Sequence, residues 1–582
     1  MLERTNISDE WERSSMKFSE MKYQRPDLAA LKHDVLRLID EFEASTTPEA
    51  ALDALQEVNR LRMDFQTMFE LAYIRNSVDT RDEFYRAEKA FFDEAAPEME
   101  ALETRLRQAL IASPHRKALE ERFGRQWFRL AEVQTRSFSD AIVEDMQKIN
   151  ARVTDYNQLV ASARIPFGGE TYNLSQMVKF TESPDRETRQ NAVRAMFGFF
   201  AEHGDSFDEM YDDLVRMRTA MAQKLGYENF VQMGYHRMNR TDYGPTETAA
   251  FREAIRKHIV PLAAEIRDKQ RERLGLSSLR IHDISLWYRD GNAHPKGDPA
   301  FILENGRRMY KELSPETDAF FQYMLDHELM DLLSREGKRV GGYCTFIPNF
   351  KAPFIFANFN GTLGDVTVLT HEAGHAFQAY QSRDMKLPEY FFPTSEAAEI
   401  DSMSMEFFTW KWMPLFFQED ADKFFYTHLA DSVVSIAYMA AVDEFQHAVY
   451  ERPEMTPAER KAKWRELERI YMNRGDEFYE GMPYLEEGGL WQRQLHIYNY
   501  PFYYIDYALA QVCALQYFLW MQNNPSEAWE SYLRLCGLGG SRSFLELVSE
   551  AGLRSPFDES TLADVVPGIR DVLSQLEAKL PS

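Results

Sequence analysis

The sequence His371-Glu372-Ala373-Gly374-His375 limits what this chain can fold into more than any other stretch. Residues four apart lie on the same face of an α-helix, one turn above the other. In a helix, His371 and His375 can therefore bind one metal ion from the same side. Glu372 projects about 100° around the helix, close to such an ion without having to ligate it.

The flanking residues indicate that this helix is buried. Val366, Val368 and Leu369 precede the motif, and Ala376 and Phe377 follow it. Unpaired polar groups in such a place cost several kcal/mol, and a metal ion would supply the missing partner. Two histidines and an adjacent glutamate in this spacing are typical of zinc hydrolases, in which the glutamate is the general base. We expect one zinc ion per chain.

Length and charge exclude some classes of protein. A chain of 582 residues is too long for one simple core, so we expect two or more lobes. The net charge of −26 argues against nucleic-acid binding, which needs a basic surface. The three cysteines, Cys344, Cys513 and Cys536, are too few and too far apart for a disulfide framework, which fits a reducing compartment.

Neither the N-terminus nor the interior predicts a targeting or membrane segment. The first ten residues are polar and acidic, unlike a signal peptide. The longest apolar run, 433–442, contains Ser435 and is typical of a buried helix rather than a membrane span. We therefore expect a cytoplasmic protein that binds neither nucleic acid nor membrane and needs no obligate protein partner.

Helical periodicity runs through most of the chain, with apolar residues at spacings of three and four. The turn sequence Pro166-Phe167-Gly168-Gly169 predicts a hairpin or loop after an N-terminal helical part. We expect a mainly α fold with an N-terminal helical lobe, 1–183, and a catalytic helical domain, 184–582. The helical stretches are 28–66, 84–162, 184–283 and 397 to the C-terminus.

One β-hairpin is predicted immediately before the metal helix. Tyr343–Ile347 and Pro353–Phe359 have strand composition, with a Gly-Gly turn before them. Pro348 and Pro353 favour edge strands, because proline cannot donate to a ladder. The sequence therefore predicts a small sheet beside the metal helix.

An exposed strand edge could hold a peptide, since an extended chain can add to it as one more strand. We expect Ala357 and Asn358 to offer that edge to a substrate backbone. The alternative is a hairpin with a structural role only. Asp365 is the expected N-cap of the metal helix.

A third metal ligand is expected on the next helix, because catalytic zinc usually has three protein ligands and an open position. Glu396, Glu399 and Glu406 fall on one broad face of that helix, and the residues between them are mostly small or apolar. Spacing alone does not choose among them, and each could instead be a solvated side chain.

The stretch from His496 to Tyr507 is rich in groups that can donate a hydrogen bond without adding a fixed charge. Pro501 fits the first turn of a helix, which leaves His496 and Tyr500 on a loop. Tyr504 and Tyr507 then lie one turn apart. A peptide hydrolase needs such donors to stabilise the oxyanion of its tetrahedral intermediate. The alternative is an aromatic packing cluster.

These three stretches, in this order, resemble the thimet oligopeptidase family of zinc metallopeptidases, and in particular its bacterial oligoendopeptidase F and Pz-peptidase branch. The resemblance extends to the length of the chain and the late position of the motif that begins at His371. It implies a mainly helical, two-lobed zincin-type fold with a deep substrate channel. Such a channel admits short unstructured peptides and excludes folded proteins.

The resemblance also assigns roles to individual residues. It implies that Glu399 is the third zinc ligand and that Glu406 supports the ligands from behind. The carbonyl-polarising histidine of the family matches His496. The tyrosines of the family match Tyr500, Tyr504 and Tyr507, although the loop after the histidine is one residue shorter here than in thimet oligopeptidase itself.

The expected reaction is zinc-assisted hydrolysis of internal bonds in short oligopeptides. Glu372 would take the proton of the attacking water, and His496 with Tyr507 would stabilise the oxyanion, with Tyr500 and Tyr504 contacting the substrate. One alternative is a helical zinc carboxypeptidase or dipeptidyl carboxypeptidase. Another is a peptide-binding protein without catalytic activity, against which the intact Glu372 argues.

Overall fold

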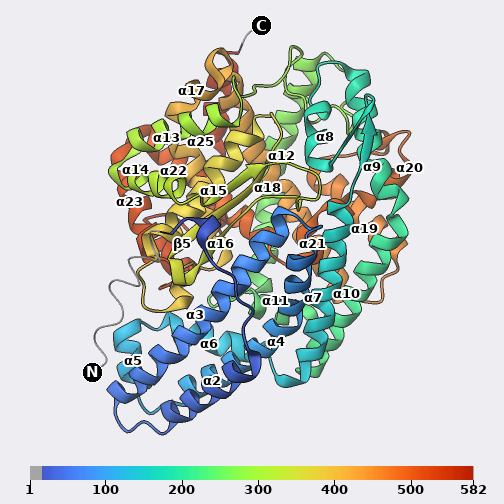
Figure 1. The fold of residues 1–582 in the computed structure, drawn as a ribbon. Helices are drawn as coiled ribbons and strands as arrows, with labels where there is room; N and C mark the ends of the chain where they lie inside the picture. The colour runs from blue at the N-terminus through green and yellow to red at the C-terminus, as the bar shows by residue number, and fades with distance from the viewer. Residues whose placement is uncertain (1–15, 581–582) are drawn as a thin grey trace.

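A group of long N-terminal helices packs around a hydrophobic core of its own. The computed structural model describes residues 16–580, and Figure 1 shows these helices in blue at the bottom. Polar side chains fix where they begin, since Asp27 and Thr47 accept N–H groups of the first turns of α2 and α3. The helices are α2 (Leu28–Glu43), α3 (Pro48–Val78), α4 (Glu83–Ala112), α5 (Arg116–Phe123) and α6 (Gln126–Arg136).

The next part of the chain joins a second, larger core. The turn predicted at 166–169 is confirmed: Gly168 and Gly169 have φ of 60° and 90° and connect a short hairpin. The elements are α7 (Val143–Ala161), β1 (Ile165–Phe167), β2 (Glu170–Tyr172), α8 (Leu174–Thr181), α9 (Arg186–Glu202), α10 (Gly204–Lys224), α11 (Phe230–Arg237), α12 (Pro245–Leu274), α13 (Pro299–Leu313) and α14 (Pro315–Asp326).

A small sheet lies beside the metal helix, as predicted, and it contains a third strand, β3, that the sequence did not predict. It consists of β3 (Met330–Leu333), β4 (Tyr343–Ile347) and β5 (Ala352–Phe359) in the order β3-β5-β4. Strand β4 is an edge strand, whereas the prediction that Pro353–Phe359 is an edge strand is wrong. Strand β3 pairs with β5 only from Ile355 onward, so no strand lies beside Pro353 on that side to require its missing N–H.

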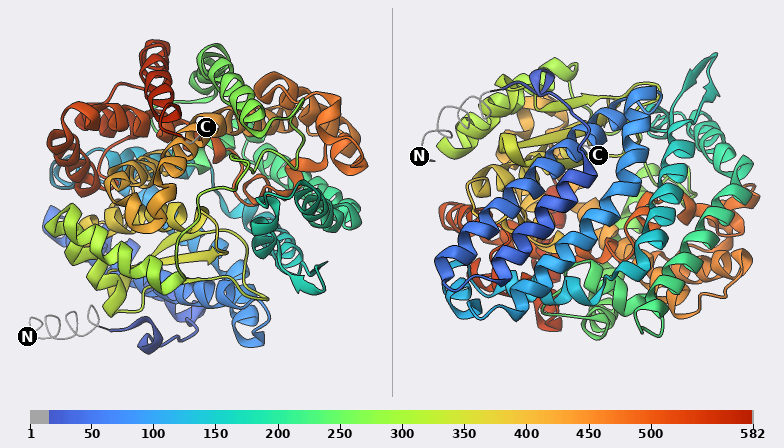
Figure 2. Two further views of the ribbon diagram at one scale, coloured as in Figure 1. Left: turned by 90° about the horizontal axis from the view of Figure 1, so that it is seen from above. Right: turned by 60° about the horizontal axis from the view of Figure 1, so that its bottom comes forward.

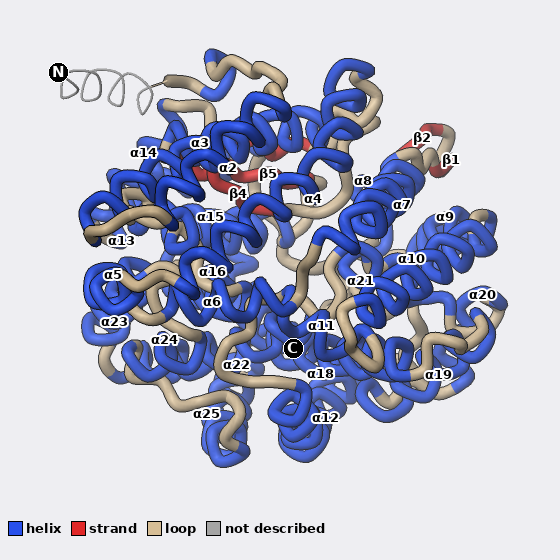
Figure 3. Tube along the Cα trace, turned by 90° about the horizontal axis from the view of Figure 1, so that it is seen from below, coloured by secondary structure: helices blue, strands red, loops and turns tan. Residues whose placement is uncertain are grey.

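The metal motif lies on α15 (Gly364–Ser382), which packs against both β4 and β5. Figure 3 shows the strands in red next to this helix. The prediction that Asp365 is its N-cap is wrong, because the helix already begins at Gly364. The Asp365 carboxylate instead accepts the N–H groups of Asn360 and Gly361, both at 2.8 Å, and so fixes the turn between β5 and the helix.

The C-terminal third is helical and covers the other side of α15 (Figures 1 and 2). The predicted mainly α fold is confirmed. None of the helices within 16–580 is both long and apolar enough to cross a membrane. The division at residue 183 stays a prediction. The helices are α16 (Ser395–Phe408), α17 (Met413–Phe417), α18 (Ala421–Glu451), α19 (Pro457–Met472), α20 (Pro483–Glu486), α21 (Leu495–Asn499), α22 (Tyr504–Asn523), α23 (Pro525–Leu538), α24 (Phe544–Glu550) and α25 (Glu559–Glu577).

Candidate active site

Three side chains from two helices converge on one point. His371 and His375 on α15 each place Nε2 3.3 Å from Oε2 of Glu399 on α16. Zinc ligands at about 2.0–2.1 Å in a tetrahedral arrangement are themselves about 3.3 Å apart, so this donor set fits a zinc ion. One ligand atom from each residue lies within 4.8 Å of the others. The sequence left three glutamates open, and the geometry selects Glu399.

The glycine of the motif allows α15 and α16 to approach closely. A Cβ at Gly374 would lie 2.6 Å from the Cα of Ser402 and 2.7 Å from the carbonyl oxygen of Asp401, distances that no side chain can occupy. The absence of a side chain there brings α16 against the face of α15 between the two histidines. Glu399, one turn before Ser402, reaches the histidine pair for this reason.

Glu406 orients the ligands from behind. Its carboxylate accepts from His371 Nδ1 and from His428 Nε2, both at 2.7 Å. A proton on Nδ1 of His371 leaves the Nε2 lone pair free to face the metal position. His428, on α18, is fixed in turn because its Nδ1 accepts from Trp410 at 3.1 Å. Sequence reasoning missed His428, since nothing near it in the chain marks it as part of the site.

Tyr503 is a second missed residue. Its hydroxyl donates to Oε1 of Glu399 at 2.6 Å, while Ser402 donates to Oε2 at 2.9 Å. Burial alone would raise the pKa of Glu399, but His375 and His371 hold it well below its usual value. The hydrogen bonds from Tyr503 and Ser402 orient the carboxylate toward the histidine pair, as a metal ligand requires.

Glu372 is placed as a base without a competing partner. The side chain is buried, and its Oε2 has no hydrogen-bond partner among residues 16–580. Burial raises its pKa, and the neighbouring His371 and His375 oppose that rise. The chain passes close to the other oxygen, because a Cβ at Gly342 would lie 3.0 Å from Oε1. Glycine at this position leaves room for the carboxylate beside β4.

His496 is a neutral donor held from both sides. It lies on the short helix α21 rather than on the predicted loop, and burial lowers its pKa to about 4. The Gln494 amide donates to Nδ1 at 3.2 Å, and Nε2 lies 3.2 Å from the hydroxyl of Tyr507. The Gln494 carbonyl accepts from Tyr438 at 3.0 Å, which orients the amide. The proton of the imidazole is thereby placed on Nε2.

The tyrosines surround His496, but the helix that carries them starts later than predicted. Pro501 is not in the first helical turn: α22 begins at Tyr504, because Phe502 has φ of 67° and interrupts the helix. The rings of Tyr504 and Tyr507 lie 5.1 and 5.7 Å from the imidazole. Tyr500 follows α21, is 45% exposed and lies 6.2 Å from the imidazole.

The residues predicted to offer a strand edge do not do so. Ala357 and Asn358 belong to the central strand β5, and Ala357 is fully buried with its carbonyl accepting from Lys338. The Asn358 amide donates to the carbonyls of Arg339 and Gly341, at 2.9 and 2.8 Å. The free edge beside the metal helix belongs to β4 instead.

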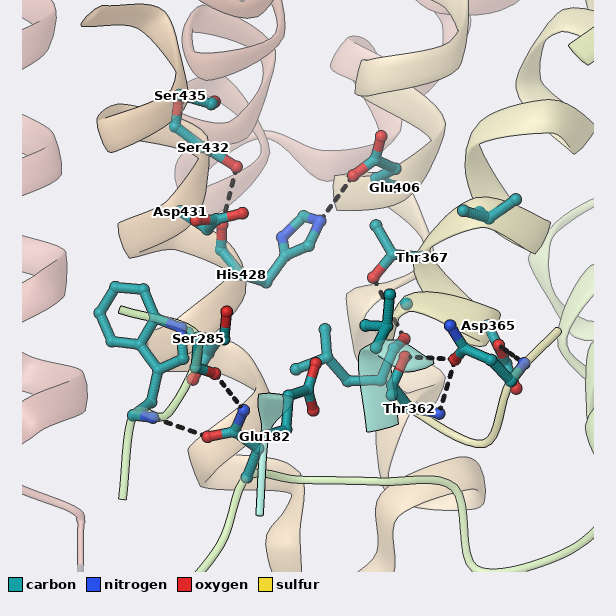
Figure 4. Close-up of a pocket in the computed structure, with 18 of the residues that line it drawn as sticks. Glu182, Ser285, Thr362, Asp365, Thr367, Glu406, His428, Asp431, Ser432 and Ser435 are labelled. Carbon is teal, nitrogen blue, oxygen red and sulfur yellow. Dashed lines mark hydrogen bonds and ion pairs between the residues drawn. The ribbon is translucent and has the colours of Figure 1, made fainter. Parts of the chain in front are cut away.

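A cavity of about 530 Å³ is lined by Glu406 and His428 rather than by the three candidate metal ligands themselves. Thr367 of α15 and Glu406 of α16 form part of its wall. Figure 4 shows His428 projecting from α18 toward Glu406, with Asp431, Ser432 and Ser435 farther along that helix. Further acidic residues in the wall are Glu182 and Asp365, and burial raises the pKa of Glu182 to about 7.

Family models match most of the chain. The model of peptidase family M3 matches residues 179–299 and 317–566, and that of the peptidase M3 N-terminal domain matches residues 18–138. The chain belongs to peptidase family M3. Oligopeptidase PepF of Bacillus subtilis is 21% identical over 92% of this chain and 81% of its own length.

Solved structures of peptidases are also similar to this chain. A structure of Pz peptidase A with an inhibitor is 52% identical, with a TM-score of 0.95 over 96% of this chain and 99% of that one. Oligoendopeptidase F from Enterococcus faecium, 15% identical with a TM-score of 0.65 over 95% and 97% of the two chains, shows the fold alone. The predicted family is confirmed, and the chain is a metalloendopeptidase of family M3.

Proposed function

We propose that this M3 peptidase is a zinc-dependent enzyme that hydrolyses internal bonds of short unstructured oligopeptides. The observation that carries the proposal is the unpaired, buried carboxylate of Glu372 beside the His371–His375–Glu399 ligand set. The Pz peptidase and oligoendopeptidase F relatives support the substrate class. A cytoplasmic location is part of the proposal, supported by three cysteines that remain free within residues 16–580.

The chain's own residues supply the proton transfers. When bound at this site, zinc lowers the pKa of a water molecule and polarises the scissile carbonyl. Glu372 accepts the proton of the attacking water at Oε2 and returns it to the nitrogen of the leaving amine. Because this oxygen forms no hydrogen bond within residues 16–580, no bond to that part of the protein has to break before it accepts the proton.

His496 and Tyr507 stabilise the negative charge that develops on the carbonyl oxygen. Within their pair the Nε2–H donates to the phenol oxygen, which leaves the phenol O–H free to donate to the oxyanion, and the Nε2–H becomes a second donor when it turns from the phenol to the substrate. The low pKa of His496, about 4, keeps the imidazole neutral near pH 7, so it donates without adding a fixed charge. Tyr504 lies against the imidazole, and Tyr500 is exposed where a peptide can reach it.

The general-base assignment is tested by Glu372→Gln. This variant should retain zinc and lose most turnover, on the order of a thousandfold or more, because the amide cannot accept the proton. Glu88→Gln, an equally buried glutamate of α4, is the matched control and should remain active. Zinc content by atomic absorption and the melting temperature verify both proteins. Near-normal turnover of Glu372→Gln would refute the assignment.

The substrate class is tested by mass spectrometry of a mixed digest of short peptides, with and without a chelator and with C-terminally amidated copies. Internal cuts that persist after amidation and disappear with chelator are expected. Release only from free C-termini would assign a carboxypeptidase. Absence of cleavage with zinc bound would favour a peptide-binding protein.

A further inference from the structure

Strand β4 has a free edge that lies between two helices. Helix α15 packs against one face of the strand, and α3 packs against the other (Figure 3). The Glu70 carboxylate of α3 accepts from the Thr345 hydroxyl at 2.8 Å. One turn later on α3, the ring of Tyr73 lies 5.2 Å from that of Tyr343. Tyr343 and Thr345 thus belong to the face toward α3, and the edge that is turned away from β5 lies between the helices.

A cavity of about 630 Å³, the edge cavity, adjoins this side of β4. Both Thr345 and Phe346 line it, although adjacent residues of a strand point to opposite faces. A space that both residues line is therefore at the edge of β4 rather than on one of its faces. The rest of the wall comes mainly from α3, α4 and residues 388–393.

The position of the general base indicates which part of a bound peptide would reach the edge cavity. Gly342, directly before β4, lies beside Glu372, because a Cβ there would be 3.0 Å from Oε1 of that residue. Thr345 and Phe346 are three and four residues farther along the chain, a distance of about 10–13 Å in a strand. A peptide that adds to β4 in the antiparallel direction, the more stable pairing, has its N-terminal part at the edge cavity. The residues three or four positions before the scissile bond then lie there.

Acidic side chains outnumber basic ones in the wall of the edge cavity, with four glutamates and two arginines. Three of the glutamates are paired with arginines: Glu100, Glu103 and Glu389. Glu70 forms no ion pair within residues 16–580 and accepts from two neutral groups, the Gln66 amide at 2.6 Å and the Thr345 hydroxyl at 2.8 Å. A carboxylate oxygen has more than one lone pair, so Glu70 can accept a further donor from the cavity.

Glu70 reduces the stability of the fold, which points to a role other than folding. The residue is 7% exposed, and burial raises its pKa to about 7 against the effect of the two hydrogen bonds. An ionised carboxylate that is buried without a counter-charge is destabilising. Such a group in the wall of a cavity is typical of a functional site rather than of a core. A cationic ligand would supply the missing counter-charge.

Aromatic rings form part of the remaining wall of the edge cavity. Phe69 of α3 lies in it next to Glu70, and Phe346 faces Phe391 with 5.1 Å between the ring centres. The face of an aromatic ring attracts an ammonium group, so a carboxylate with aromatic neighbours favours an alkylammonium ligand. Both arginines of the wall are already paired with glutamates, so the cavity has little to attract an anion.

We infer that the edge cavity is a subsite for an ammonium group of the peptide substrate, with Glu70 as the counter-ion. The ammonium group belongs to the residue three or four positions before the scissile bond, as the free N-terminus or as a lysine side chain. This inference rests on the proposed function and adds to it a preference for peptides with a positive charge at that distance from the cut. Glu70 contacts the substrate away from the reacting atoms, so its loss affects KM more than kcat.

The test uses peptides with one fixed sequence after the scissile bond and two to six residues before it, each with a free or an acetylated N-terminus. For the wild type, acetylation should raise KM about 10-fold when three or four residues precede the bond, and less than about 2-fold at the other lengths. The value of kcat should change little, and mass spectrometry locates the cut. Acetylated peptides with lysine or norleucine at the same position distinguish the sources of the ammonium group. A lower KM for lysine assigns the side chain, and a dependence on acetylation alone assigns the N-terminus.

Glu70→Gln removes the charge and keeps the size of the side chain. In this variant the KM ratio between acetylated and free peptides should fall below about 2 at every length, and any effect of lysine should disappear. Glu88→Gln, a buried glutamate of α4 outside the edge cavity, is the matched control and should keep the wild-type ratio. The melting temperature verifies that both variants are folded.

Calorimetry separates this inference from the proposed function. Binding of the same peptides to Glu372→Gln reports on the subsite without turnover, and it decides the matter even if no peptide is cleaved. The expected result is tighter binding of the peptides that carry the ammonium group, and loss of this difference when Glu70→Gln is added. Equal binding of free, acetylated and lysine-containing peptides, or a difference that persists with Glu70→Gln, would overturn the inference.

Discussion

Tyr503→Phe isolates the contribution of one hydroxyl to metal binding. In the structure this hydroxyl donates to Oε1 of Glu399 at 2.6 Å, and Glu399 is only 1% exposed. The substitution leaves Oε1 without a donor and with little access to water. A hydrogen bond to a charged group contributes about 1.5–3 kcal/mol, so a loss of about 2 kcal/mol corresponds to about a 30-fold weaker affinity for zinc.

The assay is a competition titration of zinc against a chelator of known affinity, with the melting temperature of the apoprotein measured in parallel. Tyr517→Phe is the control, because Tyr517 lies on the helix that follows Tyr503, is buried, and among residues 16–580 its hydroxyl bonds only the neutral hydroxyl of Ser531. Tyr503→Phe should bind zinc more weakly while Tyr517→Phe does not. Equal zinc affinity in wild type and Tyr503→Phe would refute the conclusion that Tyr503 orients the ligand.

Three other substitutions test the surroundings of the site. Gly342→Ala should lower kcat about 10- to 100-fold with zinc content unchanged, because its Cβ would displace the Glu372 carboxylate; unchanged kcat would contradict this. Burial raises the pKa of Glu70 to about 7 in the folded protein. As the pH rises, the carboxyl group of the unfolded chain loses its proton first, so the free energy of unfolding falls between about pH 4.5 and 7. Glu70→Gln should therefore be about 3 kcal/mol more stable than wild type at pH 8 and similar at pH 4 in urea unfolding, whereas a pH-independent difference would refute the shift. Arg240→Met should cost about 3–5 kcal/mol because it leaves Asp506 unpaired, and adding Asp506→Asn should recover part of that loss in the same assay.

Local pattern was sufficient to predict much of the fold. The helical stretches, the turn at 166–169 and strand β4 follow from periodicity and turn residues, which act over a few positions. The strand order could not be predicted from the sequence, because β3 has only four residues and pairs with β5, although β4 lies between them in the chain. When a segment has no strong strand pattern of its own, the sequence does not show that it will pair with a given strand.

The same distinction applies to the site. His371 and His375 were predicted from their spacing, since both lie on one helix. Glu399 needed the family resemblance, because three glutamates shared one face and only the crossing at Gly374 selects among them. His428 and Gln494 act across tertiary contacts, with Glu406 and His496 respectively, so no spacing in the chain reveals them.

The late start of α22 shows how a distant contact changes the chemistry of a predicted motif. Arg240 donates to the carbonyl of Phe502, and the N–H of Phe502 donates to Gln446 on α18. These bonds offset the cost of about 1–3 kcal/mol for a left-handed conformation at a bulky residue. A helix that started at Pro501 would place Tyr503 in its first turn. With Phe502 held left-handed, Tyr503 instead precedes the helix, and its hydroxyl reaches Glu399. The ligand geometry of the metal site therefore depends on a buried arginine whose side chain makes none of the contacts to the metal ligands described above.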